Sequence, residues 1–270
     1  MSLLTFWGVQ GSCPGNIFKD HLGDNTSCIS IEDNKRLFIF DAGSGIRYLS
    51  QQLNPADYEE IYLLITHSHW DHIQGFPFFG FLHSNSKITI YSHNQQHIDA
   101  MIEQINGVNF PLHYRDLAAN IVTTTNITDI NTAANVSITT VATNHHGDCI
   151  GYRFKNDEAD VCYIPDNQLH NTTVTNFDEF CKFVKGTHYL IHDSQYTEND
   201  MPHKENWGHS TVKDTCRLAT ESQSNHLILF HHDPDRSKSS ILAIEKTCNE
   251  RHSFPVTAAY EGLKLNLLGN

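Results

Sequence analysis

Four metal-binding side chains lie within six residues of one another, at His67, His69, Asp71 and His72. Imidazole nitrogens and carboxylate oxygens are ligands that suit borderline-soft divalent cations such as Zn²⁺. The chain contains 19 histidines, so a chance cluster is the alternative interpretation. The cluster follows directly after the apolar residues 61–66, which have the composition of a buried strand. Functional sites gather at strand ends, so we expect a metal site here.

Histidines and aspartates also follow other predicted strands of the chain. Asp41 ends a predicted strand at residues 36–41. Its carboxylate is either a turn or cap residue, or the group that orients a ligand histidine. Further candidates stand at or after the ends of later strands, at His145, Asp166, Asp193 and His231.

The elements that must position these residues alternate between strands and helices. Periodicity and turn signals predict helices at residues 46–53, 95–106, 177–184, 210–222 and 238–251, with Ser210 as the N-cap of the fourth. The aromatic residues 76–82 favour a further helix packed into the core, and residues 107–135 an insertion with little regular structure. Strands are predicted at residues 3–9, 27–32, 36–41, 61–66, 87–91, 136–142, 149–155, 160–164, 188–192 and 226–230, with a last strand or pair at 256–268.

Composition narrows the function and the domain organisation. No internal repeat, low-complexity tract or Pro/Gly-rich linker interrupts the chain, so one domain over residues 1–270 is favoured. The formal net charge of −13 argues against a stable nucleic-acid partner. The seven scattered cysteines form no disulfide framework, and neither a signal peptide nor a membrane span is evident. We therefore expect a cytoplasmic protein with no membrane partner.

The segment 61–75 resembles the H-x-H-x-D-H signature of the metallo-β-lactamase-fold hydrolases. The resemblance extends from Trp7-Gly8 to Glu261-Gly262, nearly the whole chain. It implies an α/β (α+β) fold of the αββα type, a four-layer sandwich with two sheets face to face and helices outside. It also implies a dinuclear site for two divalent metal ions, with Zn²⁺ expected first and Mn²⁺ as the alternative.

The family pattern implies a ligand set for this chain. One metal ion would be held by His67, His69 and a third histidine, for which His145 is favoured over His146 because it precedes Gly151-Tyr152-Arg153 at the matching distance. A strand end at Asp166 supplies the bridging carboxylate. The other metal ion would be held by Asp71, His72 and a histidine after the strand at 226–230, for which His231 is favoured over His232.

Two further segments resemble motifs of the tRNase Z subgroup: Gly208-His209-Ser210-Thr211 and His192-Asp193-Ser194. In that subgroup a histidine outside the metal coordination meets an acidic partner. His209 would then be a general acid that protonates the leaving oxygen of a phosphodiester, with Asp193 holding its ring. The alternative is a helix-capping segment that carries an incidental surface histidine.

Within the subgroup the chain most resembles small phosphodiesterases, namely phage anti-Pycsar enzymes and the cyclic-phosphate hydrolase of phosphonate metabolism. Asn25-Thr26-Ser27 and Asp71-His72-Ile73-Gln74-Gly75-Phe76 carry this likeness. The chain departs from tRNase Z at Ala42-Gly43-Ser44-Gly45-Ile46-Arg47 and lacks a Gly/Pro-rich basic arm.

The resemblance implies a phosphodiesterase that opens a cyclic nucleotide or a similar small cyclic phosphodiester. A metal-bridged hydroxide positioned by Asp71 and Asp166 would attack phosphorus. Tyr152, Arg153 and residues 76–81 are candidates for substrate contacts. The rivals are a tRNase Z-like RNA endonuclease, a carbon-ester, thioester or lactam hydrolase of the same fold, and a metal-bearing sensor without activity. Relatives are commonly dimers, so the resemblance allows a homodimer, although no residue pattern in the sequence indicates an interface.

Overall fold

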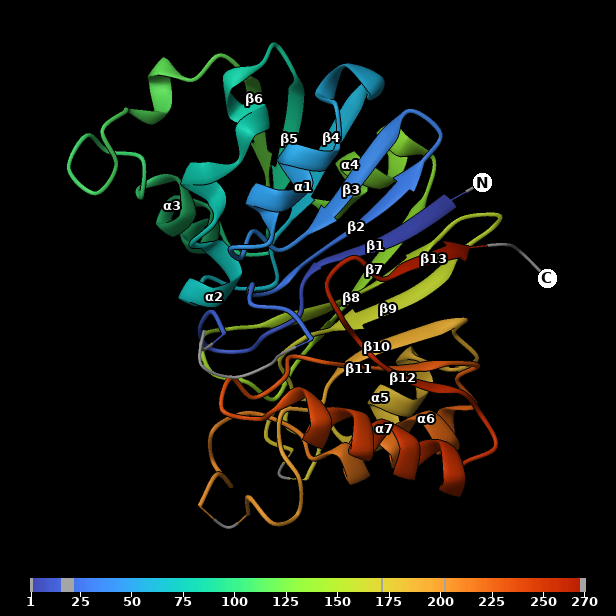
Figure 1. The fold of residues 1–270 in the computed structure, drawn as a ribbon. Helices are drawn as coiled ribbons and strands as arrows, with labels where there is room; N and C mark the ends of the chain where they lie inside the picture. Colours follow the sequence, from blue (N-terminus) through green and yellow to red (C-terminus); the bar gives the residue numbers. More distant parts are fainter. Residues whose placement is uncertain (1, 16–21, 171, 202, 268–270) are drawn as a thin grey trace.

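Two β-sheets lie face to face in the computed structural model of the chain, which describes residues 2–15, 22–170, 172–201 and 203–267 (Figure 1). Helices cover the outer faces of both sheets, so the layers run helix, sheet, sheet, helix. The predicted four-layer sandwich is therefore confirmed. Within these residues, no helix has both the length and the apolar character needed to span a bilayer.

The first sheet has the strand order β13-β1-β2-β3-β4-β5-β6. Its neighbours from β13 to β3 pair antiparallel, and those from β3 to β6 pair parallel. The strands are β1 (Ser2–Gly8), β2 (Cys28–Asp33), β3 (Arg36–Phe40), β4 (Glu60–Leu64), β5 (Lys87–Tyr91), β6 (Asn120–Thr124) and β13 (Lys264–Leu267).

The second sheet has the order β12-β11-β10-β9-β8-β7. Strands β7, β8 and β9 pair antiparallel, and β9, β10, β11 and β12 pair parallel. The strands are β7 (Ser137–Ala142), β8 (Ile150–Lys155), β9 (Asp160–Ile164), β10 (Tyr189–Asp193), β11 (Leu227–Phe230) and β12 (Val256–Ala258).

Helices α1 and α3 pack on the outside of the first sheet, and α5, α6 and α7 on the outside of the second (Figure 1). The short helix α2 carries part of the histidine motif. The α-helices are α1 (Ile46–Gln52), α2 (Trp70–Ile73), α3 (Gln95–Ile102), α4 (Ile127–Ala134), α5 (Phe177–Phe183), α6 (Val212–Ser222) and α7 (Lys238–Arg251).

Alternation along the strands explains the layers. On β3, Phe38 and Phe40 join the core between the two sheets, whereas Leu37 and Ile39 join the core under the outer helices. Side chains of a strand point to opposite faces in turn, so a strand that is apolar at every position must be covered on both sides. The sheets are therefore held rigidly against each other, which fixes the loops at their ends.

The prediction of little regular structure at residues 107–135 was wrong, because this stretch contains β6, α4 and the 3₁₀ helix η4 (Tyr114–Asp116). Strand β6 is the edge of the first sheet and is largely exposed. An edge strand obtains its hydrogen bonds from one neighbour and needs few apolar residues. The Asn- and Thr-rich sequence of β6 therefore lacks the apolar pattern from which a strand is predicted.

Two predictions about helices also need correction. Residues 76–82 form two 3₁₀ helices, η2 (Phe76–Phe78) and η3 (Gly80–His83), in place of one helix. Ser210 is not the N-cap of α6, because its hydroxyl oxygen accepts the N–H of Leu169 at 3.2 Å while its proton goes to the carbonyl of Asn167 at 2.6 Å. Thr211 takes that position and accepts the N–H of Asp214.

Candidate metal centre

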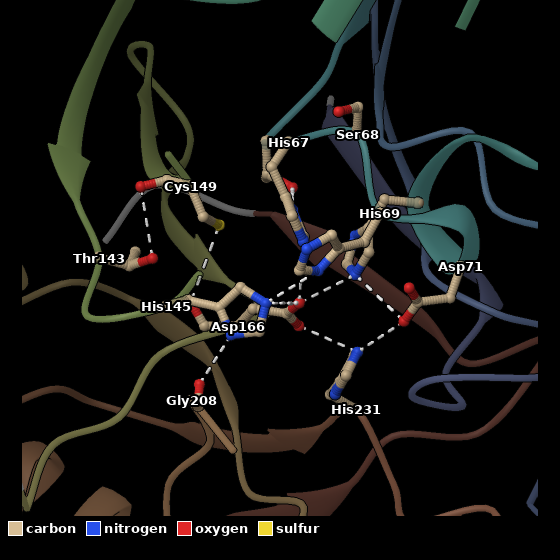
Figure 2. Close-up of polar contacts among 12 residues, drawn as sticks. His67, Ser68, His69, Asp71, Thr143, His145, Cys149, Asp166, Gly208 and His231 are labelled. Carbon is tan, nitrogen blue, oxygen red and sulfur yellow. Dashed lines mark hydrogen bonds and ion pairs between the residues drawn. The ribbon is translucent and has the colours of Figure 1, made fainter. Parts of the chain in front are cut away.

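The predicted ligands meet at the carboxyl ends of parallel strands from both sheets. His67 follows β4 in the first sheet, and Asp166 and His231 follow β9 and β11 in the second. Sites in sheets of this kind form at the carboxyl ends of the strands, where the loops are free to carry polar side chains. Figure 2 shows the side chains converging from the two sides of this junction.

All seven predicted ligands come together in two neighbouring groups, and the ligand atoms of Asp193 and His209 also lie within 4.8 Å of those of Asp166 and His231. The first consists of His67, His69, His145 and Asp166, and the second of Asp71, His72 and His231. Within each group the nearest ligand atoms all lie within 4.8 Å of one another. The groups adjoin at the carboxylate of Asp166, which lies 3.2 Å from His72 Nε2. The same carboxylate lies 2.9 Å from His231 Nε2 (Figure 2).

The separations match those between ligands that share one cation. His67 Nε2 and His145 Nε2 each lie 3.3 Å from Asp166 Oδ2. In the second group, His72 Nε2 and His231 Nε2 lie 3.3 Å and 3.1 Å from Asp71 Oδ2. Ligand atoms about 2.0–2.1 Å from a tetrahedral Zn²⁺ are about 3.3 Å apart. The spacing therefore fits a cation in each group.

Three buried atoms of the centre have no hydrogen-bond partner among the described residues: Nε2 of His67, Nε2 of His72 and Oδ1 of Asp166. Leaving a buried polar atom unpaired costs about 1–3 kcal/mol. All three atoms belong to the convergent ligand groups. Bound divalent cations would satisfy them, so the residues fit the metal ions that the fold family uses.

Hydrogen bonds on the outer ring nitrogens assign the tautomers of four histidines. In each ring Nδ1 donates to a fixed acceptor, so Nε2 is the nitrogen that faces the centre and binds a cation once it carries no proton. Thr66 Oγ1 must accept from His67 because its own proton goes to Asp41. The pairs are His67 with Thr66 Oγ1 at 3.1 Å, His72 with Asp41 Oδ2 at 2.8 Å, His145 with the Gly208 carbonyl at 2.9 Å and His231 with Gln195 Oε1 at 3.2 Å.

In the metal-free protein the ligand histidines fall into two sets, one with lowered pKa values and one with raised pKa values. Burial lowers the pKa of His145 to about 4 and that of His67 well below its usual value. Burial also acts to lower the pKa of His231, but the carboxylates of Asp166 and Asp71 outweigh it and raise that pKa to about 10. His72 behaves in the same way, with a pKa raised well above its usual value by the neighbouring carboxylates.

Two polar side chains at the centre, those of Asp41 and His231, stand on strained backbone. Asp41 and His231 each follow the last residue of a strand, and both have left-handed backbone, with φ of 61° and 59°. A non-glycine residue in this region costs of order 1–3 kcal/mol and is found mostly at functional sites. Ser12 is also left-handed, and its N–H donates to Asp71 Oδ2 at 2.8 Å.

Gly208 combines a left-handed φ of 83° with close contact to a predicted ligand. A Cβ at this position would lie 2.6 Å from Nδ1 of His145. Only glycine therefore allows the main chain to present its carbonyl to this ring.

His209 lies beside the ligand groups with its ring fixed by Asp193. Nδ1 donates to Asp193 Oδ2 at 2.8 Å, and both side chains are almost completely buried. The ring centroid is 5.0 Å from that of His231 and 5.1 Å from that of His145. The carboxylate of Asp193 accepts this bond and also the N–H groups of Asn167 and Gln195. Nε2 is therefore the nitrogen of His209 that remains for the cavity.

The alternative histidines are engaged elsewhere. His146 is exposed, and its Nε2 contacts the carbonyl of Asn206. His232 is buried, but its Nε2 donates to the carbonyl of Ala259 at 2.9 Å. Neither belongs to a ligand group among the described residues.

The predicted substrate contacts were wrong. Tyr152 is fully buried and donates its hydroxyl to the carbonyl of Ile65. Arg153 pairs with Asp160 at the opposite end of β8 and β9. Phe76, Phe79 and Phe81 belong to the core under the outer helices, and Phe78 does not line the cavity of the centre.

A cavity of about 390 Å³ opens over the centre. It is lined by three residues that the sequence analysis missed, Ser12, Ser68 and Trp70, and no Lys or Arg is among its described lining residues. Trp70 is 79% exposed. The signals in the sequence were a Gly-Ser-Cys-Pro-Gly turn after the first strand and an aromatic residue inside the histidine motif. The lining consists of Ser12, Ser68, His69, Trp70, Asp71, His145, Asp166, His209 and His231.

Comparison with known proteins agrees with the fold. Residues 36–232 match the model of the beta-lactamase superfamily domain. Because this match spans most of the chain, the protein belongs to that family. It is a metal-dependent hydrolase of the metallo-β-lactamase fold.

Among curated proteins the chain is similar to ribonuclease Z. It is 36% identical to that of Halalkalibacterium halodurans over 53 residues, which cover 20% of this chain and only 17% of that protein. It is 22% identical to ribonuclease Z of Shouchella clausii over 265 residues, covering 77% of this chain and 81% of that protein.

Two solved structures share the fold. The metallo-beta-lactamase fold protein YhfI from Bacillus subtilis superposes with a TM-score of 0.70 at 20% identity, covering 98% of both chains. A diphosphatase from the PhnP family gives a TM-score of 0.70 at 16% identity and covers 100% of both chains.

Proposed function

We propose that this hydrolase is a dinuclear phosphodiesterase that opens a cyclic nucleotide or a similar small cyclic phosphodiester. The observation that carries the proposal is the position of the His209–Asp193 pair directly beside two ligand groups that adjoin at Asp166. A phosphodiester needs charge neutralisation at phosphorus and a proton for its leaving oxygen. These residues can supply both.

Each residue of the centre has a defined role in this proposal. His67, His69, His145, Asp71, His72 and His231 would hold two divalent cations, with Asp166 between them. When bound, the cations supply Lewis-acid chemistry by acidifying water and neutralising charge on phosphoryl oxygens. Zn²⁺ suits the imidazole and carboxylate donors best, and Mn²⁺ is the alternative.

His209 is proposed as the general acid. Its Nδ1–H donates to Asp193, so a second proton on Nε2 would be the one given to the leaving oxygen. Asp193 fixes the orientation of the ring, as a carboxylate partner does in other acid–base sites. A carbon-ester or thioester hydrolase of the same fold would have no need for this pair.

The cavity favours a small substrate over RNA. Its volume of about 390 Å³ is near the lower end of the range for small-molecule sites, about 300–1,000 Å³. Its described lining contains no Lys or Arg for a long polyanion, and the whole chain has a net charge of −13. RNA binding draws much of its affinity from Lys and Arg against phosphates.

A tRNase Z-like endonuclease is the second candidate. The similarity to ribonuclease Z from Shouchella clausii over 81% of that protein favours it. The two candidates share the metal ligands and the general acid, so only the substrate separates them.

Product analysis would test the proposal. The Zn²⁺- or Mn²⁺-loaded protein is incubated with 2′,3′- and 3′,5′-cyclic mononucleotides, with bis-p-nitrophenyl phosphate and with a precursor tRNA. Asp71→Ala serves as the inactive variant and His146→Gln as the matched control. We expect the cyclic nucleotides to open to monophosphates, with loss of this activity in Asp71→Ala only. Cleavage of the tRNA without cyclic nucleotide turnover would favour the tRNase Z-like endonuclease. Absence of hydrolysis of every diester would overturn both proposed functions.

A further inference from the structure

A third cluster of metal-binding side chains lies outside the centre described above. It consists of His93, His97 and Asp148, whose nearest ligand atoms all lie within 4.8 Å of one another. His93 follows β5, and His97 lies in the first turn of α3. Asp148 belongs to the loop between β7 and β8 that also carries His145. The cluster therefore connects two loops from different sheets.

The geometry of the cluster matches a shared cation. His93 Nε2 lies 3.1 Å from Asp148 Oδ2, and the centroids of the two histidine rings are 5.4 Å apart. The first distance is close to the separation of about 3.3 Å between two ligands on one tetrahedral Zn²⁺. It also resembles the separations in the centre itself.

Unpaired atoms provide a second, independent observation. Both ring nitrogens of His93 are shielded from solvent, and neither has a hydrogen-bond partner among the described residues. The 3.1 Å approach to Asp148 is an ion-pair distance without hydrogen-bond geometry. Leaving two solvent-shielded ring nitrogens unpaired is costly even though the His93 side chain is 24% exposed. A metal ion on Nε2 would satisfy one of them.

The neighbours hold the other two ligands in place. Asn94 donates from Nδ2 to Asp148 Oδ2 at 2.9 Å. His97 Nδ1 contacts Ser68 Oγ at 3.0 Å, and its Nε2 faces the carbonyl of Asp148 at 3.1 Å. A cation between the rings would take the place of the proton that Nε2 directs at this carbonyl. The carboxylate of Asp148 is 61% exposed, which leaves a path for a metal ion and room for a water ligand.

We propose that His93, His97 and Asp148 bind a further divalent cation, with Zn²⁺ favoured by two imidazoles and one carboxylate. This site is separate from the two ligand groups of the centre and does not depend on the proposed substrate. Its role is to fasten the His145 loop to the first sheet. His97 extends the connection to Ser68, which stands between His67 and His69 and points away from their cluster (Figure 2).

Metal stoichiometry tests the proposal. The protein is stripped with a chelator, dialysed against buffered Zn²⁺ and analysed by mass spectrometry for bound zinc per chain. We expect wild type to hold one more zinc ion than His93→Gln and Asp148→Asn, whatever number the centre holds. His113→Gln is the control, because His113 is exposed and belongs to no cluster among the described residues.

The zinc content of the variants shows whether the His93, His97 and Asp148 cluster binds an ion independently of the centre. Equal zinc content in wild type and in both variants would overturn the proposal and leave a purely hydrogen-bonded connection. If His93→Gln does not fold, the nearly isosteric Asp148→Asn decides alone. As a second readout, Zn²⁺ should raise the midpoint of thermal unfolding less in the variants than in wild type, because they lose the binding contribution of one ion.

Discussion

The carboxylate of Asp41 lies 2.8 Å from Nδ1 of His72, and both side chains are completely buried. The same carboxylate accepts the N–H of Thr66 and the hydroxyl of Tyr163. Asp41 is therefore neither a simple turn residue nor a helix cap. It is the group that orients a predicted metal ligand, which decides between the two interpretations that the sequence left open.

Replacing Asp41 with Asn should weaken metal binding. The amide keeps the shape but loses the charge that holds the Nδ1 proton of His72, and loss of such a partner typically costs 10–100-fold in affinity. Zinc titration by calorimetry against wild type measures the change. Tyr163→Phe is the matched control, since it removes one bond to the carboxylate without removing its charge. Unchanged affinity in Asp41→Asn would show that the pair has no such role.

Removing the imidazole of His209 should slow turnover without emptying the centre. General acid catalysis typically contributes about 10²–10⁴-fold, so His209→Ala should lose about that much in kcat while its metal content stays that of wild type. Asp193→Asn should show a related loss because the ring is no longer held.

The leaving group offers a sharper version of this experiment. p-Nitrophenolate departs readily without a proton, so His209→Ala should retain more of its activity on bis-p-nitrophenyl phosphate than on an alkoxide-releasing diester. Equal losses on both substrates, or loss of metal, would contradict the assignment. His146→Gln controls for the substitution of a histidine nearby.

Metal binding should release protons at neutral pH. The carboxylates of Asp166 and Asp71 overcome the effect of burial and raise the pKa of His231 to about 10, so this ring is protonated in the metal-free protein. It must lose its proton to bind a cation. Affinity should therefore rise with pH up to about 10, by about tenfold per unit for each proton displaced.

Calorimetry in buffers of different ionisation enthalpy counts the protons released by zinc. Asp71→Asn removes one of the carboxylates and should reduce that count. A binding enthalpy that is the same in every buffer would show that no proton leaves.

Trp70 should act on substrate binding more than on the chemical step. Its ring is 79% exposed at the cavity over the centre, and stacking of a base on an aromatic side chain is worth about 1–3 kcal/mol. Trp70→Ala should therefore raise KM for a nucleotide substrate by roughly 5- to 150-fold, with little change in kcat. Trp70→Phe should recover most of the loss.

Phe78→Ala is the control for Trp70, because Phe78 is 57% exposed and does not line the cavity. A substrate without a base, such as bis-p-nitrophenyl phosphate, should respond less to Trp70→Ala. An equal effect on every substrate would show that Trp70 positions Asp71 and does not recognise the base.

The candidate ligands could be located because some of their signals are local and the family pattern implies the rest. His67, His69, Asp71 and His72 are close in sequence, and Asp166 and His231 follow apolar strands that the pattern alone reveals. The partners that orient them could not be found in this way. Gln195 and Gly208 contact ligand rings only because the second sheet brings distant loops together.

The errors in the fold have a similar cause. Strand β6 is stabilised by its pairing with β5, and its own residues are mostly polar and exposed. Thr211 caps α6 in place of Ser210 because a contact 43 residues away, at Asn167, already uses the serine hydroxyl. Local propensity cannot anticipate such competition.

The order of the ligands along the chain has a consequence for how the protein is made. Asp71 and His231 lie 3.1 Å apart in space but 160 residues apart in sequence. At about 5–20 residues per second, the ribosome adds His231 roughly 8–30 seconds after Asp71. During that interval His67, His69 and His72 are present in the nascent chain but His231 is not. The ligand group of Asp71, His72 and His231 is therefore complete only after His231 has been added, later than the group of His67, His69, His145 and Asp166.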